Sequence, residues 1–207
     1  MRRSKRGGVN LFGLRFGPLD AVDRDRLVAA ARAAVPTYDH VGSTLDPSRW
    51  AAPCVRVRHR TVGRGPAAFE AARQALRTWV PQLGIGATVE PAGEPVVTGA
   101  TVLVVLRRGP FHVVAPDRIV GVIDEPRRFG YAYGSLPGHP ERGEESFLVE
   151  HLDDDTVCAS IRVQAGPGTL PAHAVAPLVR AAQHAALDGY LGAIARHVHH
   201  QRPGATA

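Results

Sequence analysis

The segment between Tyr131 and Glu145 carries residue types from which a chemical site can be built. It reads YAYGSLPGHPERGEE and places two tyrosines, one histidine and three acids between two strand-like stretches. A hairpin loop needs turn-forming residues, but it does not need this concentration of titratable groups. A histidine beside carboxylates suits general acid–base chemistry when burial moves a pKa toward neutrality, and a tyrosine hydroxyl can polarise a carbonyl.

Alternation along the following strand predicts which acid faces the interior. Successive side chains of a strand point to opposite faces. Glu145 therefore shares a face with Phe147 and Val149, whereas Glu144 shares the other face with Ser146. We expect Glu145 to face inward, where a carboxylate must be paired, hydrogen-bonded or neutral because an isolated buried charge costs several kcal/mol.

These arguments define a set of candidate site residues. The candidate catalytic residues are His139, Glu141 and Glu145. The candidate ligand-binding residues are Tyr38, His40, His59, Tyr131, Tyr133, Arg142 and Glu144. Two interpretations stay open: an acid–base site, or a structural His/Glu network that fixes the loop without chemistry. We expect no metal and no cofactor, since the histidines near the C-terminus have no acidic or cysteine neighbour in sequence.

The N-terminal third predicts one helix, one turn and one strand. A helix over about 19–34 is capped by Asp20 and is followed by a polar turn over 36–44. From Val55, apolar and basic residues alternate. This pattern predicts a half-buried strand with His59 on its inward face. The arginines of the alternate positions then form an outward basic face: Arg56, Arg58 and Arg60.

The remaining elements predict a helix-grip fold. A helix follows Pro66 and runs to about Val80, where Pro81 is expected to end it. Seven strand candidates follow, over 87–90, 99–107, 111–115, 118–124, 129–135, 144–151 and 156–164, and their short connections favour antiparallel pairing. A last helix begins between Pro171 and Pro177. The order indicates an α+β, START-like helix-grip fold, in which a curved antiparallel sheet of six to seven strands wraps on a long C-terminal helix, with an extra N-terminal helix.

Composition and charge restrict the function classes. The 207 residues suit one domain over 37–200, preceded by a basic tail and helix over 1–36 and followed by a disordered tail over 201–207. Four of the six net positive charges come from residues 2–6, so the rest of the chain is close to balanced and predicts no nucleic-acid partner. No apolar run is long enough to span a bilayer, and two cysteines in apolar contexts fit a reduced, cytoplasmic protein.

Three stretches carry a resemblance to a known family. They are TYDHVGST at 37–44, Gly63-x-Gly65 with Phe69 and Trp79 in the helix after it, and YAYGSLPGHPExGEExF at 131–147. With these motifs the chain resembles, over about 37–198, the bacterial and plant family called domain of unknown function 1990, or UPF0548. The resemblance brings no assigned activity with it.

From these observations we expect a protein that binds a small apolar or amphipathic organic molecule between the sheet and the C-terminal helix. One alternative is a cofactor-free lyase, cyclase or isomerase that uses the same His, Glu and Tyr residues for proton transfer. A second alternative is an interaction module whose arginine-rich strand face meets an acidic partner. A homodimer is left open.

Overall fold

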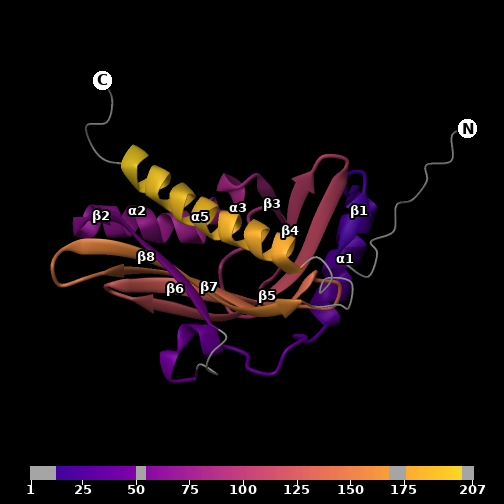
Figure 1. Ribbon diagram of the computed structural model, residues 1–207, viewed down its shortest axis with the longest axis horizontal. Helices are drawn as coiled ribbons and strands as arrows, with labels where there is room; N and C mark the ends of the chain where they lie inside the picture. The colour runs from indigo at the N-terminus through magenta and orange to yellow at the C-terminus, as the bar shows by residue number, and fades with distance from the viewer. Residues whose placement is uncertain (1–12, 50–54, 168–175, 202–207) are drawn as a thin grey trace, which may run out of the picture.

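A single antiparallel sheet of eight strands organises the chain in the computed structural model, which describes residues 13–49, 55–167 and 176–201 (Figure 1). Seven strands are hydrogen-bonded in the order β2-β8-β7-β6-β5-β4-β3, and the short strand β1 pairs with β5. The strands are β1 (Leu14–Phe16), β2 (Arg56–Arg64), β3 (Ala87–Glu90), β4 (Thr101–Arg108), β5 (Phe111–Glu125), β6 (Arg128–Ser135), β7 (Glu141–His151) and β8 (Thr156–Pro167). Residues 1–12 of the expected basic tail and helix, Cys54 and most of the expected C-terminal tail over 201–207 lie outside the described residues.

Helices lie on both faces of the sheet. The long helix α5 (Ala176–His200) crosses one face together with α2 (Gly65–Arg77) and α3 (Val80–Gly84) (Figure 1). Helix α1 (Ala21–Ala33) lies on the opposite face, and the two short 3-10 turns η1 (Ser43–Leu45) and η2 (Pro47–Arg49) follow it along the chain. A curved antiparallel sheet that grips a long C-terminal helix is the helix-grip fold, as the element order predicts. None of the helices in the described ranges is long and apolar enough to cross a membrane.

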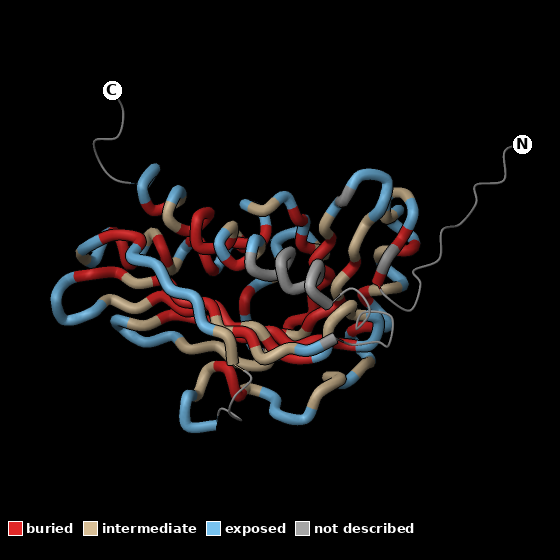
Figure 2. The backbone as a smooth tube through the Cα atoms, viewed as in Figure 1, coloured by how far each residue is buried: buried red, intermediate tan, exposed pale blue. Residues whose placement is uncertain are grey.

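The main core fills the space between the sheet and α2, α3 and α5. Its centre is aromatic, with Tyr131 stacked on Phe147 at 5.3 Å and Tyr190 of α5 edge-on to Phe147 at 5.2 Å between ring centroids. A smaller cluster on the other face joins Leu103 and Val105 of β4 to α1. The strands β6 and β7 and the neighbouring part of β8 are therefore buried, whereas much of the edge strand β2 is exposed (Figure 2).

Strand β5 corrects the expectation of two separate strands over 111–115 and 118–124. It runs through Pro116 without a break. The amide of Val114 donates to Gly13 beside β1, so the nitrogen of Pro116, two residues on, points to the same side. On that side of β5, pairing with β1 ends at Val113 and pairing with β6 begins at Asp117. Pro116 lies between the two partners, so its missing N–H removes no hydrogen bond of the sheet.

The helix after β2 also differs from expectation. It ends at Arg77, and Trp79 adopts a left-handed conformation with φ of 60°. Pro81 does not end the helix but occupies the first turn of α3, where a proline costs no hydrogen bond. This break directs Gln82 into the core, where its side chain is fully buried.

Candidate functional site

A tyrosine–glutamate pair lies on the sheet face that α5 covers. Tyr133 and Glu145 are directly opposite each other in the β6–β7 ladder, so they share a face with Tyr131 and Phe147. The Tyr133 hydroxyl donates a hydrogen bond of 2.6 Å to Oε2 of Glu145. Glu145 therefore faces inward, as the alternation of the strand predicts.

The surroundings of this pair shift its acid–base properties. Burial raises the pKa of Glu145 to about 7, although the Tyr133 hydrogen bond and the positive charge of Arg56 act in the opposite direction. Burial, with the charge of Glu145 adding to it, also raises the pKa of Tyr133 well above its usual range. Near neutral pH the carboxyl group therefore populates both protonation states while the tyrosine stays a hydrogen-bond donor.

Asp117 and His139 extend the polar cluster toward the end of β6. Asp117 is 2% exposed, and burial together with the charges of Glu145 and Glu141 raises its pKa well above the usual value. His139 Nε2 lies 3.6 Å from Oδ1 of Asp117, and its Nδ1 lies 2.8 Å from the Glu141 amide nitrogen. Burial lowers the His139 pKa to about 4. The ring is thus neutral at pH 7, and its Nδ1 lies 2.8 Å from both the amide nitrogen and the carbonyl oxygen of Glu141, so the tautomer sets whether Nδ1 accepts from the one or donates to the other.

Two polar residues of the cluster escape sequence reasoning. Asp117 follows Pro116, and this dipeptide is typical of a turn, so it falls between two expected strands. Gln82 Nε2 donates to the Tyr131 hydroxyl at 3.1 Å, but it follows the proline expected to end the helix. The one signal in the sequence is Asp117 itself, because burying a charged residue between apolar strand residues is costly unless its carboxyl group has polar partners.

Glu144 and Tyr38 belong to a different arrangement, on the opposite face of the sheet. Glu144 is 2% exposed because the 37–45 segment covers it. Its Oε2 accepts from the Tyr38 hydroxyl at 2.8 Å and from the Gly42 amide at 2.6 Å, and its Oε1 accepts from the amide and hydroxyl of Thr44 at 2.8 and 2.5 Å. A side chain at Gly134 would overlap the Tyr38 ring, so the glycine makes room for this segment. The structure therefore separates Tyr38 and Glu144 from Glu145.

The structure does not bring the other predicted ligand-binding residues to the cluster. His40 and Arg142 are exposed, and the expectation that His59 faces the core is wrong because it is exposed on the outer face. The one buried apolar side chain of β2 is Val62, which shares its face with the arginines and not with His59. The basic row expected to face outward lies on the helix side: Arg56, Arg58 and Arg60.

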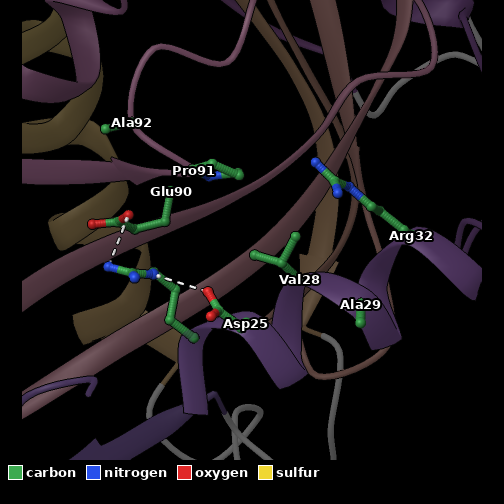
Figure 3. A pocket seen from close by; sticks show the side chains of 8 residues that line it. Asp25, Val28, Ala29, Arg32, Glu90, Pro91 and Ala92 are labelled. Carbon is green, nitrogen blue, oxygen red and sulfur yellow. Dashed lines mark hydrogen bonds and ion pairs between the residues drawn. The ribbon is translucent and has the colours of Figure 1, made fainter. Parts of the chain in front are cut away.

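A hollow lies between α1 and the end of β3, apart from the cluster around Glu145 (Figure 3). It encloses about 680 Å³ and is lined by Arg24, Asp25, Val28, Ala29, Arg32, Glu90, Pro91 and Ala92. Its arginines are paired, since Arg24 lies 3.8 Å from Glu90 and Arg32 lies 3.7 Å from Glu94. These ion pairs hold both arginines to carboxylates of the β3 end. Among the described residues, no group of three or more His, Cys, Asp or Glu side chains could hold a metal ion.

Solved structures share the fold at low sequence identity. "Hypothetical Protein jhp0584" from Helicobacter pylori superposes with a TM-score of 0.53 at 14% identity, covering 82% of this chain and all of that one. TTHA0849 from Thermus thermophilus gives a TM-score of 0.50 at 12% identity, over 72% of this chain and 99% of that one. These likenesses concern the fold alone.

Sequence relatives are more informative about family. A "UPF0548 protein" of Deinococcus radiodurans is 38% identical over 138 residues, which span 59% of this chain and 67% of that protein. A "UPF0548 protein" of Arabidopsis thaliana is 35% identical over 97 residues, which span 43% of this chain and 46% of that protein. The family described as "Domain of unknown function (DUF1990)" matches residues 37–193, from the segment that covers Glu144 to the helix that carries Tyr190. With most of its length in that match, the chain belongs to the DUF1990 family.

Proposed function

We propose that the protein binds a small amphipathic organic molecule between the sheet and α5, with a polar group of that molecule held by Tyr133 and Glu145. The observation that carries the proposal is this hydrogen-bonded pair, 2.6 Å apart, on the helix-facing side of a sheet lined with aromatic rings. Binding sites for small molecules combine mostly apolar walls with a few polar groups that fix orientation.

The charge state of the cluster favours an uncharged polar group on the ligand. At neutral pH His139 is neutral, Asp117 has a raised pKa and Glu145 is partly protonated. A carbonyl or hydroxyl oxygen can accept from the Tyr133 hydroxyl or from a protonated Glu145. A carboxylate at the same position would face acidic groups in a medium of low dielectric constant and would be repelled.

The pKa of Glu145 favours a second candidate function, a cofactor-free enzyme that transfers protons. A carboxyl group with a pKa of about 7 can accept and return a proton at neutral pH, which is the property that general acid–base catalysis requires. In this reaction Glu145 would remove a proton next to a carbonyl group while Tyr133 donates a hydrogen bond to the enolate oxygen that forms. An isomerase step ends when Glu145 returns the proton to another carbon of the enolate. In a lyase step the enolate expels a group from its β-carbon, and in a cyclase step its carbon attacks a second carbonyl of the same molecule; in both, the departing group or new alkoxide takes the proton from Glu145.

The test is native mass spectrometry of freshly purified protein, followed by extraction and identification of any bound molecule. The proposal expects a stoichiometric organic ligand with an apolar body and a carbonyl or hydroxyl group. A protein that is empty and whose melting temperature does not respond to a broad metabolite panel would contradict it.

The variant Glu145→Gln then separates the two functions. For a carrier we expect affinity to fall about tenfold with the ligand chemically unchanged, because an amide N–H replaces the stronger O–H donor of the protonated carboxyl group. For an enzyme we expect turnover to be lost while affinity is nearly retained. Glu150→Gln is the matched control, because it removes a carboxylate from the opposite face of the same strand.

A further inference from the structure

The arginine row of β2 lies on the same side of the sheet as the tyrosine–glutamate pair. Arg56 is opposite Val163 in β8, and Val163 is opposite Glu145 in β7. Residues directly opposite each other in an antiparallel ladder place their side chains on one face. Arg58 and Arg60 follow at alternate positions, so all three arginines lie on the helix side of the edge strand, next to α5.

Helix α5 adds a fourth guanidinium to this edge. A methyl group built on Gly192 would lie 3.2 Å from Nη1 of Arg196 and 3.7 Å from Nη1 of Arg60. Both nitrogens therefore approach one point on the helix surface, one from α5 itself and the other from β2. Gly192 has no side chain, and this leaves the space that the two guanidinium groups share.

Three of these four charges lack acidic partners. Arg56 acts on the carboxyl group of Glu145, but within the part of the chain that the structure describes Arg58, Arg60 and Arg196 form no ion pair with an aspartate or glutamate. The remaining segments of the sequence contain no aspartate or glutamate at all. Neighbouring like charges repel each other, and an anion placed between them relieves the repulsion and accepts hydrogen bonds from both.

We propose that Arg58, Arg60 and Arg196 form an anion-binding site, and that the ligand is an amphipathic organic anion whose phosphate, sulfonate or carboxylate group is held there. This inference rests on the proposed function, because the uncharged end of the same molecule reaches Tyr133 and Glu145. Two strand spacings separate β2 from β7, so the two polar ends of the ligand lie roughly 10 Å apart or more.

Two fluorescent probes with nearly the same ring system test this site. 8-Anilinonaphthalene-1-sulfonate carries an anionic group, and N-phenyl-1-naphthylamine is its uncharged counterpart. We expect the wild-type protein to bind the sulfonate about tenfold more tightly or better. In Arg60→Gln/Arg196→Gln the preference for the sulfonate should disappear while affinity for the uncharged probe stays the same. Both arginines are exposed, and circular dichroism checks that the variant remains folded.

The control is Arg49→Gln, which removes the same charge from the loop on the opposite face and should keep the preference. Equal affinity for the two probes in the wild type, or a preference that survives in the double variant, overturns the anion site but leaves the proposed function standing. Failure of both probes to bind overturns both. Competition with inorganic phosphate tests whether the ligand needs an apolar part. If free phosphate binds as tightly as the sulfonate, the proposal that the ligand is amphipathic is overturned.

Discussion

The substitution Glu145→Gln is expected to stabilise the protein above neutral pH and to leave it almost unchanged in mild acid. The pKa of Glu145 is about 7 in the folded protein, against 4.5 for a free glutamate side chain. Between these values the unfolded chain releases a proton that the folded chain keeps, so this group stabilises the fold in full below pH 4.5. That contribution is lost as the pH rises through 7.

The magnitude follows from the difference between the two pKa values. Each unit corresponds to 1.36 kcal/mol, so the group lowers the free energy of unfolding by about 3 kcal/mol between about pH 4.5 and pH 8. The glutamine side chain of the variant does not ionise and still accepts the Tyr133 hydrogen bond. Removing the charge also relieves Asp117, whose raised pKa depends in part on Glu145, and this adds to the gain in the same direction.

Urea denaturation of both proteins at the two pH values measures the effect. The difference in unfolding free energy between variant and wild type should be about 3 kcal/mol more favourable at pH 8 than at pH 4.5. Glu150→Gln, on the other face of β7, should show no such gain, since it loses an ion pair 3.4 Å long to Arg128. A Glu145→Gln variant with the same relative stability at both pH values would refute the assignment of Glu145 as a buried, reluctantly ionised acid.

Two further predictions concern its neighbours. Glu144→Gln should destabilise the protein by about 3 kcal/mol or more at pH 7, because its NH2 group would replace a carboxylate oxygen that accepts from the Gly42 or Thr44 amide, and two donors would then face each other. Thermal denaturation measures this loss, and a value below about 1 kcal/mol would contradict the prediction. For His139 the folded pKa of about 4 lies below the ordinary 6.5, so stability should fall by about 3 kcal/mol as the pH drops through this range, and His139→Gln should remove this dependence in denaturant titrations at pH 7 and 4; an unchanged slope would argue against a buried neutral ring.

Much of the fold can be read from local patterns. Alternation along β6 and β7 correctly places Glu145 on the inner face, and Asp20 caps α1 as expected, with its side chain accepting from the Asp23 amide at 2.8 Å. These features depend on neighbours in sequence. The same alternation correctly places Glu144 on the other face of β7. It cannot indicate that this face is covered by a segment about a hundred residues earlier in the chain.

The edge strand β2 shows where local patterns mislead. Val57 and His59 alternate with arginines, and this favours an apolar inner face, yet Val57 is 36% exposed and the arginines lie on the helix side. An edge strand has only one neighbouring strand, and the first half of β2 lies outside the main core. Neither face of this half is buried, so its apolar residues are not forced to face the core. Pairing with β8 and the burial of Val62 decide its orientation.

The sequence by itself determined the helix-grip architecture and the inward direction of Glu145, because alternation and helical periodicity act over a few residues. Only the tertiary structure decided which polar residues meet. It placed Asp117 and Gln82 in the cluster, assigned Glu144 and Tyr38 to the opposite face, and put the largely exposed β2 arginines on the helix side of the sheet. These outcomes depend on strand register and on which segment covers each face, and both are set by contacts between residues distant in sequence.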